Sequence, residues 1–170
     1  MKIFVIDQDV SVQNFFKTLE KKMNFEVVGV DKVAKAIFNL KSSKDITLVI
    51  IGKTEDNIMQ TIEACQFVNP NIPIFLLTNN PQDPELKKAF YYGIRGTLSK
   101  PLNQDEITEV LQEIQVIEHF KSDLQTILDK VPKSGGEKEL DEKGKVIMEI
   151  LKEAYELEQE RKIKKGGLSS

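Results

Sequence analysis

Residues 3–16 read IFVIDQDVSVQNFF, and their pattern predicts the first unit of the fold. Its first four residues are apolar and mostly β-branched, which favours a buried strand. The polar group 7–9 ends the strand, and apolar residues then recur at the spacing of a helix, at Val12, Phe15, Phe16, Leu19 and Met23. A strand followed through a short polar loop by an amphipathic helix predicts one unit of an α/β fold.

The same alternation occurs four more times along the chain. Further strands are predicted at residues 25–30, 48–51, 72–77 and 94–98. Apolar spacing predicts the other helices over 33–40, 58–67 and 86–91, with a last one that begins at Asn103. Strands with near-continuous apolar runs are covered on both faces, so we expect a doubly wound, five-stranded parallel sheet between two layers of helices.

The candidate site follows from this architecture, because ligands bind beyond the carboxyl ends of the strands in such a sheet. The residues that come directly after the predicted strands carry carboxylate, amide, hydroxyl and ammonium groups. They are Asp7, Gln8 and Asp9 after the first strand, Gly52 and Lys53 after the third, Thr78 and Asn79 after the fourth, and Lys100 after the fifth.

Four segments carry a resemblance to response-regulator receiver domains of the CheY-like superfamily. IFVIDQDVSVQNFF resembles their first strand, acidic loop and first helix, and TLVIIG (47–52) resembles the strand that ends in the phosphoacceptor aspartate. IPIFLLTN (72–79) is similar to the strand with the switch threonine, and GIRGTLSKP (93–101) to the glycine-to-lysine–proline ending. The four segments occur in the family's order, and the resemblance extends over about residues 1–118.

The resemblance implies a flavodoxin-like fold with strand order 2-1-3-4-5 and a cis peptide bond before Pro101. It also implies a role in bacterial two-component signal transduction and phosphorelay. We assign residues 1–120 to this receiver-like domain.

The chemistry of the family is where this sequence departs. A receiver uses an acidic pair and an aspartate to hold Mg²⁺, which requires oxygen ligands, and phosphorylates that aspartate. On the matching positions, the pair is Asp7 and Gln8, and the acceptor is Gly52, which has no side chain. Asp7 and Asp9 are the acids left for a metal, so we expect no Mg²⁺ cofactor, no catalytic residue and no enzymatic activity.

Two alternatives stay open at this site. One is a phosphorylatable regulator that uses Asp9 or Asp56 as its acceptor, although the loop acids Glu55 and Asp56 are expected to be solvated. The other is a sensor of a small anion or ligand, bound by Lys53, Thr78 and Lys100. For Lys100 we favour an ion pair with Asp7 across the top of the sheet.

The output side of the switch is also changed. By resemblance, an aromatic residue stands three positions before the lysine of the fifth strand, and here that position is Thr97. A small polar residue changes little apolar area when it rotates, so it makes a poor switch. We expect Tyr91 and Tyr92 nearby to be ordinary packing residues.

The last third of the chain predicts a helical extension over 121–163. Apolar spacing runs unbroken from 103 to 131, a helix of about 43 Å that exceeds a small sheet. A breaker cluster at 132–137 precedes a second amphipathic helix over 138–163, and 164–170 is expected to be a flexible tail. We favour self-association or partner binding over a hairpin within the chain.

Composition excludes several other classes. The 170 residues are 40% hydrophobic and 30% charged with a net charge of −3, which is typical of a globular protein without a basic stripe for nucleic acid. A lone cysteine, Cys65, is expected to be buried and suits the reducing cytoplasm, and His119 has no metal-ligand partner. No apolar stretch is long enough for a membrane span.

These observations predict a pseudo-receiver that acts without phosphorylation. It would bind a protein partner or a second copy through its fourth helix, fifth strand and fifth helix together with the C-terminal helices, with no nucleic acid or membrane as partner.

Overall fold

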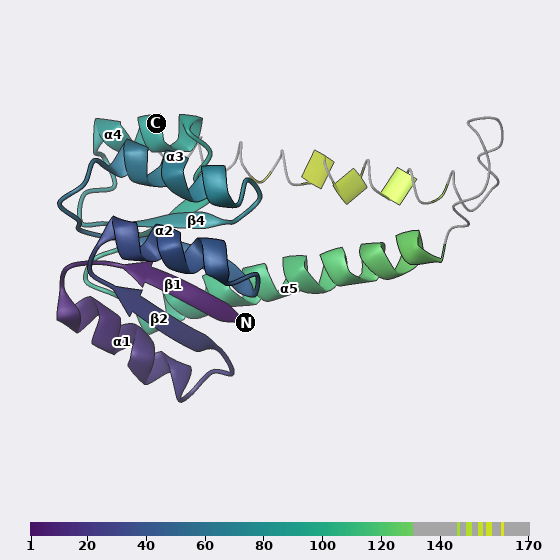
Figure 1. Ribbon diagram of the computed structural model, residues 1–170, viewed down its shortest axis with the longest axis horizontal. Coiled ribbons are helices and arrows are strands. Elements are labelled where there is room, and N and C mark those ends of the chain that lie inside the picture. The colour runs from purple at the N-terminus through teal and green to yellow at the C-terminus, as the bar shows by residue number, and fades with distance from the viewer. Residues whose placement is uncertain (131–145, 147–148, 151–152, 155, 158–160, 162–170) are drawn as a thin grey trace.

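The computed structural model describes residues 1–130 and eight residues between 146 and 161, namely Val146, Glu149, Ile150, Glu153, Ala154, Glu156, Leu157 and Arg161. Strands and helices alternate five times along residues 1–130 (Figure 1). The strands are β1 (Lys2–Ile6), β2 (Glu26–Val30), β3 (Ile46–Ile51), β4 (Ile74–Thr78) and β5 (Gly96–Ser99). The helices are α1 (Val10–Glu20), α2 (Val33–Ser42), α3 (Ile58–Val68), α4 (Pro84–Tyr91) and α5 (Gln104–Asp129).

All strand pairs are parallel, and the order in the sheet is β2-β1-β3-β4-β5. The expected flavodoxin-like topology is therefore confirmed, as is the cis bond between Lys100 and Pro101. Each predicted strand lies within two residues of its observed bounds, because the β-branched apolar runs coincide with the buried strands.

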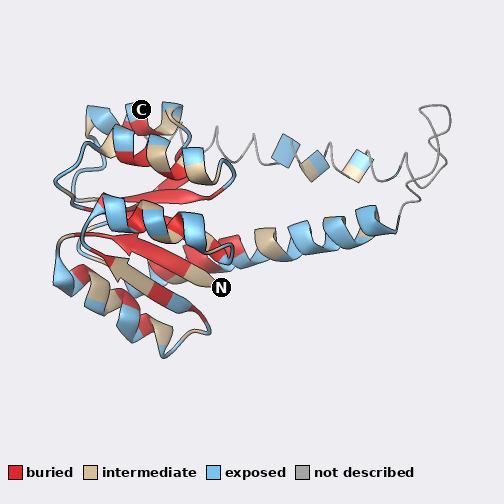
Figure 2. Ribbon diagram, viewed as in Figure 1, coloured by how far each residue is buried: buried red, intermediate tan, exposed pale blue. Residues whose placement is uncertain are grey.

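Two apolar cores lie on the two faces of the sheet (Figure 2). Along β1, Phe4 and Ile6 contribute to the core covered by α2, α3 and α4, whereas Ile3 and Val5 contribute to the core covered by α1 and α5. Successive residues of a strand point to opposite faces. Strands buried on both faces therefore need an apolar residue at every position.

Two aromatic residues lie outside these cores, contrary to the sequence-based prediction. Apolar spacing over 58–67 predicts a buried stripe that includes Phe67, and the sequence also predicts that Tyr91 packs, but both side chains are about nine-tenths exposed. Each stands two positions after a fully buried residue, Cys65 and Ala89 respectively. Positions two residues apart differ by about 200° around the helix axis, so both side chains lie on the side opposite the core and point to solvent. Tyr92 does pack against the core.

Helix α5 is 26 residues long, and only its first half is buried against the sheet, through Ile107, Val110, Leu111 and Ile114. The second half extends beyond the sheet, as expected (Figure 1). The predicted break at 132–137 and the tail 164–170 lie outside the described residues, and the eight described residues between 146 and 161 are helical. Arg161 forms an ion pair with Glu113, so the C-terminal segment returns to α5 within the chain.

Candidate functional site

The centre of the site is the Asp7 carboxylate, which follows β1 and is completely buried. Its Oδ1 accepts the backbone N–H of Asp9 at 2.8 Å. Its Oδ2 accepts the backbone N–H of Lys53 at 3.2 Å and lies 3.4 Å from Lys100 Nζ. Both oxygens are thus engaged, as a buried charge requires.

Lys100 reaches Asp7 from the end of β5. Its side chain is 28% exposed, so its ammonium remains partly solvated while it faces the buried carboxylate. The backbone N–H of Lys100 also donates to the Thr78 carbonyl at 2.8 Å, which aligns the ends of β4 and β5. The expected ion pair across the top of the sheet is present.

Gly52 directly follows β3 and lies next to this carboxylate. A Cβ built on Gly52 would lie 1.8 Å from Asp7 Oδ2 and 3.1 Å from Leu77 Cδ1. The Asp7 carboxylate therefore occupies the space that any side chain at position 52 would need. The observed position of Asp7 requires glycine at this point of the sheet.

Gln13 supports the loop that follows β1, and the sequence analysis did not identify it as a site residue. Its Nε2 donates to the Asp7 carbonyl at 2.8 Å. Its side chain also covers Gly29 on β2, where a Cβ would lie 2.5 Å from Gln13 Oε1. A polar residue one helical turn after the Asp9 cap was the available signal, but sequence alone does not reveal its contact with β2.

The two other residues of the first loop, Gln8 and Asp9, make no side-chain hydrogen bond to the Asp7 carboxylate among the described contacts. Asp9 caps α1 by accepting the Ser11 N–H at 2.8 Å, and hydrogen bonding with Ser11 lowers the pKa of Asp9. Gln8 is half-buried, and its backbone N–H donates to the Lys53 carbonyl at 2.9 Å. The first loop is thus tied to the loop after β3.

Thr78 and Thr97 are half-buried on β4 and β5. The Thr78 hydroxyl donates to the Asn80 carbonyl and accepts the Asn80 N–H, both at 3.0 Å, so it is engaged by its own loop. Thr97 lies opposite Leu76 in the β4–β5 pairing. The loop acids Glu55 and Asp56 are exposed, as expected.

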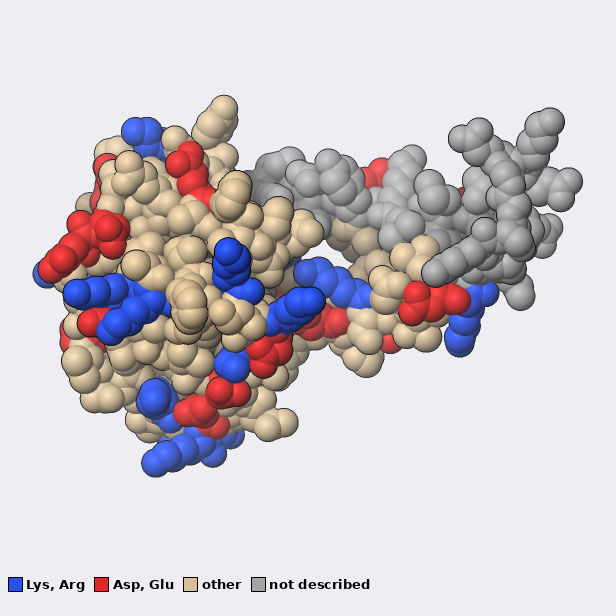
Figure 3. All heavy atoms as spheres, viewed as in Figure 1, with Lys and Arg blue, Asp and Glu red and all other residues tan. Residues whose placement is uncertain are grey.

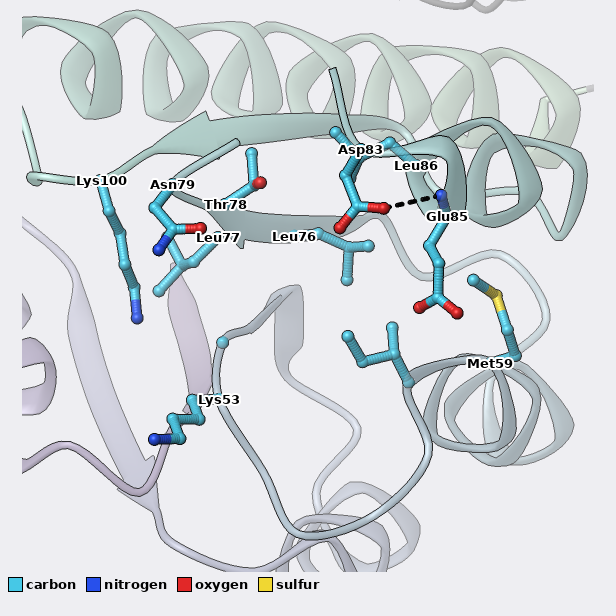
Figure 4. A pocket seen from close by; sticks show the side chains of 12 residues that line it. Lys53, Met59, Leu76, Leu77, Thr78, Asn79, Asp83, Glu85, Leu86 and Lys100 are labelled. Carbon is cyan, nitrogen blue, oxygen red and sulfur yellow. Dashed lines mark hydrogen bonds between the residues drawn. The ribbon is translucent and has the colours of Figure 1, made fainter. Parts of the chain in front are cut away.

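A cavity of about 280 Å³ opens beside the carboxylate, between the N-termini of α3 and α4 (Figure 4). Lys53, Thr78 and Lys100, the residues of the expected pocket, all line it together with Gly52 and Asn79. The sequence did not reveal the rest of the lining. These residues are Ile58, Met59, Leu76, Leu77, Asp83, Glu85 and Leu86.

Two other candidate residues are placed away from this site. Cys65 is fully buried on α3, and burial raises the pKa of its thiol to about 12. His119 is exposed on α5 beside Asp123. Within the part of the chain that the structure describes, no three His, Cys, Asp or Glu residues form a group that could hold a metal ion.

Comparison with known proteins identifies the family. The model of the response regulator receiver domain family matches residues 3–112. The crystal structure of an adenylate cyclase from Rhodopirellula baltica is similar with a TM-score of 0.66 and 20% identity, over 76% of this chain and 98% of that one. A receiver domain protein from Clostridium thermocellum has a TM-score of 0.64 and 18% identity, over 70% and 97% of the two chains.

The chemotaxis protein CheY4 of Vibrio cholerae has a TM-score of 0.59 and 19% identity, over 66% of this chain and 97% of its own. No curated protein sequence matches the chain significantly. Because the family model covers more than half of the sequence, the chain belongs to the response regulator receiver domain family. None of the described helices is both long and apolar enough to span a membrane.

Proposed function

We propose that this receiver domain works without phosphorylation, as a protein-interaction module in two-component signal transduction. The observation that carries the proposal is the position of the Asp7 carboxylate over Gly52. Position 52 has no nucleophile, and the space beside it is filled by a carboxylate already paired with Lys100. A phosphoryl group would meet negative charge there in place of an acceptor.

The same contacts argue against a Mg²⁺ cofactor. Mg²⁺ binds carboxylate and carbonyl oxygens in near-octahedral geometry. Asp7 uses both carboxylate oxygens for protein hydrogen bonds, and Asp9 uses Oδ1 to cap α1. Gln8 offers only a neutral amide. The residues present therefore do not fit the ion. We infer that Lys100, in place of a metal ion, neutralises the charge of the Asp7 carboxylate.

Incubation of the full chain with acetyl phosphate and Mg²⁺, read by intact mass, tests the proposal. We expect no mass increase of one phosphoryl group. A stoichiometric adduct that disappears in Asp9→Asn or Asp56→Asn would overturn the proposal and support a regulator with an unusual acceptor. Glu63→Gln, at an exposed position of α3 outside the cavity, is the matched control.

We infer that partners bind through α4, β5 and α5 together with the segment that follows α5. Beyond the sheet, α5 exposes apolar side chains at Val116, Phe120 and Leu128, and the returning segment exposes Val146 and Leu157. Apolar residues grouped on one elongated element are typical of a protein interface. On the face shown in Figure 3, basic and acidic side chains are interspersed, which favours a protein partner over nucleic acid.

A further inference from the structure

We propose that the cavity between α3 and α4 binds a small aliphatic zwitterion whose carboxylate and ammonium are separated by a methylene chain, an ω-amino acid. The inference does not rest on the proposed interaction role, although α4 contributes Glu85 and Leu86 to the cavity and also belongs to the proposed interaction surface. It rests on the distribution of charge around the cavity wall.

One end of the cavity is cationic. Figure 4 shows Lys53 and Lys100 on the same side of the cavity, at the ends of β3 and β5. The Lys100 ammonium faces Asp7 at 3.4 Å, so these two charges offset one another. The Lys53 ammonium has no ion pair or hydrogen bond among the described residues. This end therefore carries a positive charge that an incoming carboxylate can neutralise.

The opposite end is anionic. Asp83 uses one carboxylate oxygen to cap α4, accepting the Glu85 N–H at 2.9 Å. The carboxylate of Glu85 has no partner within the described part of the chain, and Figure 4 shows it across the cavity from the two lysines, beside Met59. An ammonium group bound here would meet an unpaired carboxylate.

The wall between the charged ends is apolar. Leu76 and Leu77 lie between them in Figure 4, and Ile58, Met59 and Leu86 complete this part of the lining. Contact with methylene groups is favourable on such a wall, at about 25 cal/mol per Å² of apolar surface buried. At about 280 Å³, the cavity is at the lower end of the range for small-molecule sites.

This arrangement selects among small ligands. An α-amino acid carries both charges on one carbon, so it can satisfy only one end of the cavity. A simple carboxylic acid leaves Glu85 unpaired, and a simple amine leaves Lys53 unpaired. Only a ligand with a carboxylate, an aliphatic spacer and a terminal ammonium matches all three parts of the wall.

Isothermal titration calorimetry of the full chain tests the proposal. The probes are glycine, β-alanine, γ-aminobutyrate, δ-aminovalerate and ε-aminocaproate, with pentanoate and pentylamine as analogues that lack one charge. We expect saturable binding in the millimolar range or tighter, with an optimum at one spacer length. γ-Aminobutyrate and α-aminobutyrate are isomers, and the first should bind more tightly because only its charges are separated.

Two substitutions identify the charged ends. Lys53→Met keeps the aliphatic stem and Glu85→Gln keeps the shape, and each should weaken the best ligand by about three- to fivefold, as expected for partly solvated ion pairs. Lys53→Met should leave pentylamine binding unchanged, and Glu85→Gln should leave pentanoate binding unchanged. Lys87→Met and Glu63→Gln, at exposed positions outside the lining, should have no effect.

Three results would overturn the inference. The first is the absence of saturable binding by any probe up to about 10 mM. The second is equal affinity for the two aminobutyrate isomers, because the ligand would then not span the cavity. The third is an equal loss of affinity for the best ligand in the two cavity variants and in their controls. None of these results bears on phosphorylation or on partner binding, so the proposed function is tested separately.

Discussion

Gly52 and Asp7 depend on one another at the scale of single residues. In Gly52→Ala, the new Cβ would lie 1.8 Å from Asp7 Oδ2 and would push the carboxylate away from Lys100 and the Lys53 N–H. Crowding in a packed site costs about 1–3 kcal/mol. We expect the free energy of unfolding, measured with urea, to fall by that amount.

A double-mutant cycle separates this contact from other effects of the methyl group. In an Asp7→Ala background, Gly52→Ala should lower the free energy of unfolding by at least 1 kcal/mol less than it does in the wild type. This difference is about the coupling energy expected for two residues in contact. Glu63→Ala, at an exposed position of α3 outside the cavity lining, is the control, and its effect should add to that of Asp7→Ala. Additive effects of Asp7→Ala and Gly52→Ala would show that the two residues are not coupled.

Cys65 provides a second prediction for a single residue. Burial raises the pKa of its thiol from 9.0 to about 12. Between these two pKa values the unfolded chain releases the thiol proton, whereas the folded chain keeps it. The free energy of unfolding therefore falls as the pH rises from 9.0 toward 12. Wild type should lose more stability than Cys65→Ala over this interval, as measured by urea unfolding at each pH.

The same thiol should be unreactive in the folded chain. At pH 8 we expect a thiol reagent to modify Cys65 only after unfolding, since the thiolate is the nucleophile. Rapid modification of the native protein would contradict the buried position of Cys65.

At the scale of elements, α5 depends on its N-terminal cap. The Asn103 side chain accepts the N–H groups of Asp105 at 2.8 Å and Glu106 at 3.3 Å. Loss of such a cap costs about 1 kcal/mol. Asn103→Ala should therefore lower the free energy of unfolding by about that amount in urea, whereas Asn103→Asp should keep it near the wild-type value. Equal effects of the two changes would show that the cap does not stabilise α5.

At the scale of the whole molecule, the prediction concerns assembly through α5. Its second half exposes Val116, Phe120 and Leu128, and a second copy could cover these side chains. We expect light scattering to show the full chain as larger than a monomer and a 1–120 truncation as monomeric. The truncation keeps all the α5 residues that are buried against the sheet, the last of which is Ile114.

Phe120→Glu should shift the full chain toward the monomer. Gln115→Glu adds the same charge at an exposed polar position of α5 and is the control. If the full chain and the truncation are both monomeric, the C-terminal segment is not an assembly element. The segment that contains Arg161 would then pack only against α5 of its own chain, as the Arg161–Glu113 ion pair indicates.

The sequence alone determined the sheet and its helices, because apolar periodicity is a local property of each segment. The strand order and the cis bond before Pro101 were implied by the resemblance to receiver domains, and the candidate site residues were predicted from their positions at the ends of the strands. Local spacing was misleading at Phe67 and Tyr91, where a two-residue offset on a helix turns an aromatic side chain to solvent. The absence of an acceptor side chain at Gly52 could be read directly from the sequence.

The tertiary structure was needed to show what occupies the space next to Gly52 and what surrounds the cavity. Asp7, Gly52 and Lys100 are separated by 45 and 48 residues, and their atoms meet only because parallel strands end at the same edge of the sheet. Glu85 and Met59 likewise face the lysines through the packing of α4 and α3. Contacts of this kind depend on side-chain geometry between distant segments, which no local pattern of residues encodes.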